Sequence, residues 1–196
     1  ECAFVNLLEP GDKVVIAING VFGGRMLENA RRCGAVPVVV EFAWGTPVDP
    51  GPVEEALKAN PDAVALAFVH AETSTGVRSD AQPLCKLAHD HGCLSIVDAV
   101  TSLGGIRLCV DEWGVDAIYS GTQKCLSAPP GLSPVSFNEA AMAKVSTPPA
   151  GFHSVTPYLA IRDAVAAVEF YRRAFGAELV MKLTMPDGRY AHAEIR

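Results

Sequence analysis

The sequence predicts an α/β fold in which a mostly parallel sheet carries helices on both faces, followed by a single small βαββ unit. Three observations lead to this prediction. Short β-branched runs alternate with helical patterns, and the runs are continuously apolar, as in strands buried on both sides. A proline-rich junction, STPPAG, then precedes a tail of different pattern. We therefore expect a first domain over 1–145, a junction over 146–151 and a second domain over 152–196.

The elements of the first domain follow one another in a regular order. A short helix opens the chain and ends at the Pro10-Gly11 pair. Strands are expected at 13–18, 36–42, 63–70, 93–100 and 116–121, where β-branched and other apolar residues form runs of strand length. Helices are expected at 25–33, 53–59 and 81–91, between these strands. This alternation is typical of βαβ units, whose strands run parallel.

The tail repeats neither this order nor its spacing. After a strand, a helix is expected over 163–175, with apolar residues on one face and Gly176 as its stop signal. A hairpin turned by Pro186, Asp187 and Gly188 follows. The tail therefore reads as a βαββ unit.

Composition excludes several classes of protein. Of the 196 residues, 49% are hydrophobic and 19% charged, which is typical of a globular chain with a sizeable core. The net charge is −6 without a basic run, so we expect no nucleic-acid partner. The apolar runs reach only strand length, which predicts no membrane span. The six cysteines form no C-x-x-C pair and favour reduced thiols in the cytoplasm.

Polar residues stand where the predicted parallel strands end, and ligands bind at that edge of such sheets. The ends carry Asn19-Gly20, the segment HAETSTG at 70–76, Asp98, and the segment 120–124. Together they offer a lysine amine, a carboxylate, several hydroxyl groups and the ring of Phe22 among glycines. Pyridoxal phosphate needs this set of groups: an amine for its aldehyde, a carboxylate for its ring nitrogen, an aromatic face, and hydroxyls for its phosphate and ring oxygen.

The motifs of the first domain resemble those of one enzyme family. LLEPGDKV, HAETSTGV, IVDAVTSLGG and YSGTQKCLSAPPGLSPVSF are similar to segments of the alanine–glyoxylate and serine–pyruvate aminotransferases, class V members of the fold type I pyridoxal phosphate enzymes. The resemblance covers residues 1 to about 145. It implies a partial large domain of that fold, because the family places a phosphate cradle before this segment and a smaller domain after it.

The resemblance also implies roles for individual residues. Lys124 would carry the Schiff base and move the proton at the substrate carbon, and Asp98 would pair with the pyridinium nitrogen. The other expected cofactor contacts are Gln123 to the phosphate, Thr73 near the ring oxygen, Phe22 in the stacking position, and Val100. The implied reaction transfers an amino group from alanine or serine to glyoxylate or a similar 2-oxo acid, and the implied assembly is a homodimer.

Each assignment has a structural alternative. Lys124 could be an ordinary surface lysine, and Asp98 could cap a following helix. Phe22 could be a core residue, and Thr73 to Thr75 a plain turn. The pair His89 and His91 has loose metal-ligand spacing, but we interpret it as a solvated helix end.

The tail resembles the first module of the glyoxalase/bleomycin-resistance/dioxygenase (VOC) superfamily, of the PhnB-like kind, from about residue 151. This resemblance implies pairing with a second module around a metal or small ligand. We predict no metal site; His153, His192 and Glu194 are the groups available for one, and His192 and Glu194 share a strand face. The alternative is a polar face left exposed without its partner module.

Three readings of the function follow from these observations. The first is the pyridoxal phosphate-dependent transaminase core. The second is a metal- or small-ligand-binding module of the VOC type, formed by the tail. The third is a non-functional fusion fragment in which neither site is complete.

Overall fold

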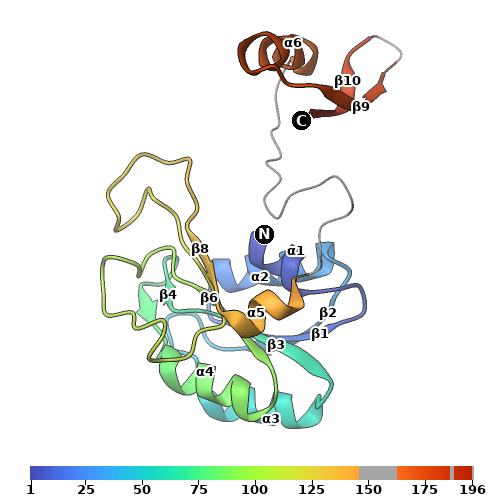
Figure 1. Ribbon diagram of the computed structural model, residues 1–196. Helices are drawn as coiled ribbons and strands as arrows, with labels where there is room; N and C mark the ends of the chain where they lie inside the picture. Colours follow the sequence, from blue (N-terminus) through green and yellow to red (C-terminus); the bar gives the residue numbers. More distant parts are fainter. Residues whose placement is uncertain (146–162, 186–187, 196) are drawn as a thin grey trace. The chain divides into compact units, whose positions relative to one another are not determined.

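The computed structural model of the chain describes residues 1–145, 163–185 and 188–195 (Figure 1). The chain divides into two compact units, Glu1–Ser146 and Thr147–Arg196. This division falls at the proline-rich junction.

A six-stranded sheet forms the centre of the first unit. Its order is β2 (Val36–Glu41), β1 (Lys13–Ile18), β3 (Ala63–Val69), β6 (Leu94–Asp98), β7 (Ala117–Tyr119) and β8 (Val135–Phe137). All neighbouring pairs are parallel except β7 and β8, which pair antiparallel. The predicted mostly parallel α/β sheet is confirmed, and the crossovers place its carboxyl-terminal ends at one edge.

Helices cover both faces of this sheet, as predicted (Figure 1). Helices α1 (Cys2–Leu7), α2 (Val21–Arg32) and α5 (Glu139–Lys144) lie on one face, and α3 (Pro50–Ala59) and α4 (Ala81–Asp90) lie on the other. Strand β3 has unlike sides: Leu66 and Phe68 belong to the core under α3 and α4, whereas Ala65 and Ala67 belong to the core under α2. The sheet face that packs against α2 is therefore formed partly by small side chains.

Two helices begin earlier than their sequence pattern indicates. Helix α3 begins at Pro50, because the Asp49 side chain caps it by accepting a hydrogen bond from the Gly51 amide at 2.9 Å. Helix α2 begins at Val21, four residues before the predicted start. Its first turn contains Gly23 and Gly24, which are poor helix formers. Contacts from the distant residues Glu72 and Ser74 stabilise that turn.

Four elements of the first unit were not predicted. They are strand β8, helix α5, and the strands β4 (Ala71–Glu72) and β5 (Val77–Arg78), which form a short antiparallel hairpin inside the segment HAETSTGVR. Each is two to six residues long, too short to show a clear hydrophobic period.

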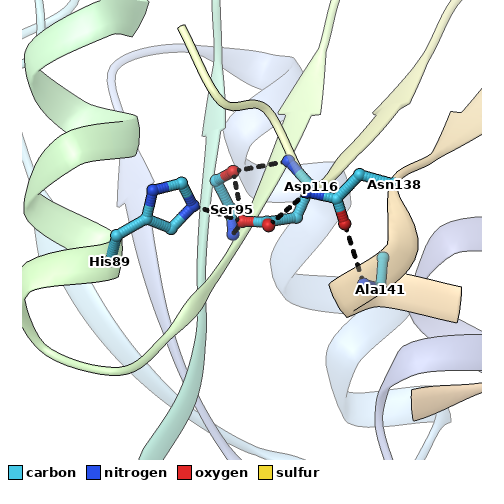
Figure 2. Close-up of polar contacts among 5 residues, drawn as sticks. All are labelled: His89, Ser95, Asp116, Asn138 and Ala141. Atoms are coloured by element: carbon cyan, nitrogen blue, oxygen red, sulfur yellow. Dashed lines mark hydrogen bonds and ion pairs between the residues drawn. The ribbon is translucent and has the colours of Figure 1, made fainter. Parts of the chain in front are cut away.

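A buried carboxylate joins the elements at the amino-terminal ends of β6 and β7 (Figure 2). Oδ2 of Asp116 accepts hydrogen bonds from the Ser95 amide at 2.7 Å and the Ser95 hydroxyl at 2.8 Å. Its Oδ1 accepts from the Asn138 side chain at 2.7 Å, and Asn138 in turn caps α5 through the Ala141 amide at 2.9 Å. Asp116 therefore links β6, β7 and α5 at the edge opposite the strand ends that carry the predicted site.

The second unit contains helix α6 (Ala164–Phe175) and an antiparallel hairpin of β9 (Leu179–Thr184) and β10 (Tyr190–Ile195). Asp163 caps the helix, and Gly176 ends it in a left-handed conformation with φ 69°, as the sequence predicts. The predicted apolar face is only partly covered, because Val168 is buried but Phe175 is 74% exposed. The expected first strand, with His153, and the turn residues Pro186 and Asp187 lie outside the described residues.

Within the described ranges, no helix combines the length and the apolar composition that a membrane span requires.

Candidate functional site

The predicted site residues lie at or just beyond the carboxyl-terminal ends of the parallel strands. Phe22 stands in the first turn of α2 after β1, and Thr73 lies in the loop after β3. Asp98 is the last residue of β6, and Lys124 follows β7 by five residues. Since the strands β1, β3, β6 and β7 are parallel, their ends face the same side of the sheet.

Asp98 is a buried carboxylate, only 6% exposed. Its Oδ1 accepts a hydrogen bond of 2.9 Å from the amide of Val100, and Tyr119 also hydrogen-bonds to it. Burial raises the pKa of Asp98, the negative charge of Glu72 adds to the rise, and the two hydrogen bonds oppose it. In the described residues, no lysine or arginine forms an ion pair with this carboxylate. Its charged form is therefore short of a cationic partner.

Thr101 connects three of the loops at this edge. Its hydroxyl donates to the carbonyl oxygen of Ala71 at 2.7 Å, and the hydroxyl of Thr73 lies 3.2 Å from it. The Cys125 thiol donates to the Thr101 carbonyl at 3.3 Å. Thr101 therefore ties the loop of Thr73 and the loop after Asp98 to the residue next to Lys124.

Lys124 lies on the long loop between β7 and β8, which Figure 1 shows extending away from the sheet. The base of this loop is closed: the Thr122 hydroxyl donates to the Pro129 carbonyl at 2.7 Å, and the Ser120 amide donates to the Pro134 carbonyl at 2.8 Å. Gln123 and Lys124 are exposed beyond this closed base. Within residues 1–145, no hydrogen bond or ion pair joins Lys124 to Asp98, Thr73 or Phe22.

Phe22 is half-buried, and its backbone is held from the Thr73 loop. The Phe22 amide donates to Oε2 of Glu72 at 3.1 Å, and the Val21 amide donates to the Ser74 hydroxyl at 3.0 Å. The loop between β4 and β5 therefore caps α2, which explains the early start of that helix. This loop is more than the plain turn considered as an alternative for Thr73 to Thr75.

Glu72, Thr101 and Tyr119 were not predicted as site residues, although all three interact with predicted ones. Glu72 stands inside the quoted segment HAETSTG, where a fully buried glutamate is unusual. Thr101 and Tyr119 gave no signal of their own, because hydroxyl residues near a strand end are common. Their contacts depend on the tertiary fold.

The polar side chains at the carboxyl-terminal edge of the sheet fit a polar ligand such as pyridoxal phosphate. In the described part of the chain, the buried side-chain atoms without a hydrogen-bond partner are all on loops that leave the strand ends or on the hairpin there: Asn19 Oδ1, His70 Nδ1, Thr75 Oγ1 and Ser102 Oγ. Asp98 supplies a carboxylate that a pyridinium nitrogen would match in charge. The residues present are therefore compatible with the cofactor.

No three histidine, cysteine, aspartate or glutamate side chains come together as a metal site among those that the structure describes. His89 lies at the end of α4, 2.8 Å from Asp116 Oδ2, so it takes part in the buried network and is more than a solvated helix end. His192 and Glu194 both lie on β10, and their side chains lie outside what the structure describes.

Comparison with known proteins gives a family match, to the model described as aminotransferase class-V, over residues 1–166. This match runs past residue 145, where the resemblance of the sequence motifs ends. Alanine–glyoxylate aminotransferase of Rattus norvegicus is 42% identical over 162 residues, which is 81% of this chain and 39% of that protein. (S)-Ureidoglycine–glyoxylate transaminase of Bacillus subtilis is 42% identical over 140 residues, 71% of this chain and 33% of that protein.

A solved structure agrees with the sequence relatives. The crystal structure of an alanine–glyoxylate aminotransferase from Nostoc sp. matches with a TM-score of 0.70 and 40% identity, over 73% of this chain and 38% of that one. The chain thus spans less than two fifths of the length of these relatives. The family match ends at residue 166, before most of the tail.

Proposed function

Because the chain belongs to the class V aminotransferase family, we propose that it forms the cofactor-binding core of a pyridoxal phosphate-dependent transaminase. Members of this family use pyridoxal phosphate. The observation that supports the proposal best is the buried, cation-free carboxylate of Asp98 at a sheet edge where Thr101 joins the loops of Thr73 and Lys124.

Asp98 would act on the cofactor ring. When bound, pyridoxal phosphate withdraws electrons from the substrate carbon that loses its proton. A carboxylate beside the ring nitrogen keeps that nitrogen protonated, and the Val100 amide and Tyr119 hold the carboxylate in one orientation. Phe22 would cover a ring face, Thr73 would bond near the ring oxygen, and Gln123 would contact the phosphate.

Lys124 would have two tasks. Its amine would hold the cofactor at the aldehyde carbon, and the freed amine would then act as the base and acid that moves a proton at the substrate α-carbon. Lys124 is exposed, which leaves its amine free for these tasks. The overall exchange converts the donor amino acid to its 2-oxo acid and the acceptor 2-oxo acid to an amino acid, so the amino group is conserved.

The proposed acceptor is glyoxylate or a similar 2-oxo acid, and the proposed donor is alanine or serine. The names of the relatives from Rattus norvegicus and Bacillus subtilis share glyoxylate but differ in the donor. We further propose a homodimer located in the cytoplasm. All six cysteines are free thiols, which supports a reducing compartment.

Reductive trapping tests this proposal directly. The purified chain is incubated with pyridoxal phosphate and borohydride, and peptide mass spectrometry then identifies the modified lysine. We expect one adduct on Lys124 and none in the Lys124→Ala variant, while Lys144→Ala serves as the matched control and keeps the adduct. Adducts spread over several lysines, or an adduct that survives Lys124→Ala, would contradict the proposal and favour the fragment reading.

We propose a second role for the tail, as a VOC-type module over 152–196 that pairs with a second copy. The order of α6, β9 and β10 supports it, as does the division of the chain at the junction. Exposed apolar side chains at Phe170, Phe175 and Val180 offer surface for a partner module. Metal content after gel filtration, compared with the double variant His192→Ala/Glu194→Ala, tests it. A metal-free protein that elutes as a monomer contradicts it.

A further inference from the structure

Glu72 is a fully buried carboxylate that bonds to backbone and hydroxyl groups. Its Oε2 accepts hydrogen bonds from the amides of Phe22 at 3.1 Å and Gly23 at 3.3 Å. Its Oε1 accepts from the Ser74 amide at 3.1 Å and the Ser74 hydroxyl at 2.7 Å. Among the described residues, no lysine, arginine or histidine forms an ion pair with it. Four hydrogen bonds and the positive end of α2 offset the cost of burying this charge.

These bonds use the whole first turn of α2. The Val21 amide donates to the Ser74 hydroxyl, so the first three amide groups of the helix all bond to Glu72 or Ser74. The approach is close: a Cβ at Gly20 would lie 2.4 Å from Glu72 Cγ and 2.6 Å from Ser74 Oγ. A rigid connection therefore joins Phe22 on α2 to Thr73, because Thr73 lies between Glu72 and Ser74, the two residues that cap this helix.

We propose that Glu72 is a positioning residue, which fixes the ring of Phe22 relative to Thr73 and Asp98; its bearing on the cofactor rests on the proposed function. A helix N-terminus commonly binds phosphate, but here the chain's own carboxylate occupies that place. The first turn of α2 is thus left to present a ring face, and the cofactor phosphate must be held elsewhere. The Glu72 charge also acts on Asp98, on which it raises the pKa.

A cofactor-free experiment tests the positioning itself. Phe22→Trp places a reporter indole on the first turn of α2, and its near-UV circular dichroism is obtained by subtracting the spectrum of the parent chain, which contains Trp44 and Trp113. We expect Glu72→Gln to remove most of this reporter signal. The amide retains one acceptor oxygen but turns an NH₂ group toward Ser74 N–H or toward the α2 amides, so one pair of bonds is lost.

Asp116→Asn is the matched control. Asp116 is also a buried carboxylate with hydrogen bonds to backbone and side chains, but it lies at the opposite edge of the sheet. The Asp116→Asn substitution should lower the stability of the chain and leave the reporter signal of the folded protein intact. Loss of the signal in both variants, or in neither, overturns the proposal. If Glu72→Gln does not fold, Ser74→Ala decides, because it removes two bonds of the same cap; an unchanged reporter signal there overturns the proposal.

A second readout uses the cofactor in the otherwise unaltered chain. Glu72→Gln should weaken pyridoxal phosphate binding about tenfold, the effect of losing one buried contact, and should change the visible circular dichroism of the bound cofactor. Asp116→Asn should change neither. Equal affinity and equal visible spectra for Glu72→Gln and the parent chain overturn the proposal. If the parent chain takes up no cofactor, the proposed function fails, and the measurement on the reporter indole still decides the role of Glu72.

Discussion

The Nε2 atom of His89 on α4 lies 2.8 Å from Oδ2 of Asp116, at the start of β7. The imidazole is 41% exposed, whereas the Asp116 side chain is only 4% exposed. A surface helix is thereby joined to the interior network that also holds Ser95 and Asn138 (Figure 2). This network secures the frame of the sheet at the edge away from the candidate site.

Asp116→Asn should destabilise the chain by about 2 kcal/mol. The new amide would point its NH₂ group at the donor group of Asn138, and Asn138 cannot turn without releasing its cap on Ala141. Urea unfolding measures the change in free energy. Asp62→Asn is the control: Asp62 forms an exposed ion pair with Lys13, so its loss should change the free energy of unfolding far less. Equal effects of the two substitutions would contradict the buried role of Asp116.

Asp116 also predicts part of the acid sensitivity of the fold. Burial alone would raise its pKa, but hydrogen bonds from Ser95, His89 and Asn138 outweigh burial and hold the pKa below its usual value. Because the folded pKa is depressed, this stabilisation is present above the unfolded value of about 4 and is lost as the pH falls through the folded pKa. Urea unfolding of the parent chain and of Asp116→Asn between neutral pH and pH 3 should converge toward acid. A constant difference would contradict this account.

Asp98→Asn should have opposite effects on the free chain and on cofactor binding. The raised pKa of Asp98 means that its charged form is disfavoured in the folded state, so a neutral amide should stabilise the cofactor-free chain by about 1 kcal/mol at neutral pH. The same change should weaken pyridoxal phosphate binding, since the carboxylate that we propose for the ring nitrogen is gone. Thermal unfolding and spectral titration measure the two effects. A lower melting temperature together with unchanged binding would contradict both parts.

Two neighbouring glycines in α2 should respond in opposite directions to alanine. A Cβ at Gly23 would lie 2.9 Å from the backbone Cα of Ile18, so Gly23→Ala should destabilise the chain by about 2 kcal/mol. A Cβ at Gly24 meets no atom within 4 Å, and Gly24→Ala should stabilise the helix by roughly 0.5–1 kcal/mol. Urea unfolding of the two variants side by side checks this, and a loss of stability in Gly24→Ala would show that the helix approaches the sheet differently.

The sequence predicts the frame of the fold well. Strand β1 and helix α4 are found where the apolar runs place them, within one residue, because each buries a continuous or periodic apolar surface. The start of α2 was missed because its first turn depends on Glu72 and Ser74, residues about fifty positions away. Strand β8 was missed because three residues carry too little pattern.

In the candidate site, too, some residues could be predicted from the sequence and others could not. The positions of Asp98, Thr73 and Phe22 at one edge of the sheet could be predicted, because they lie at or beyond the ends of recognisable parallel strands; their roles toward a cofactor stay predictions. Thr101 could not be predicted, since its role comes from contacts with Ala71, Thr73 and Cys125 on other segments. The assignment of Lys124 still depends on its motif, because its side chain makes no polar contact to the other predicted residues within the first unit.

Ala65 and Ala67 lie beneath α2 on a face of β3 whose other side carries Leu66 and Phe68. Methyl groups therefore face α2 at these two positions of β3, beside the larger Val14 and Ile16 of β1, and Gly23 already lies close to the backbone of β1. A valine at Ala67 would lift the helix and tilt the first turn that carries Phe22. Core residues that cannot contact a ligand would thus influence the position of Phe22. Substitutions inside the core could therefore change how a ligand lies at the carboxyl-terminal edge of the sheet.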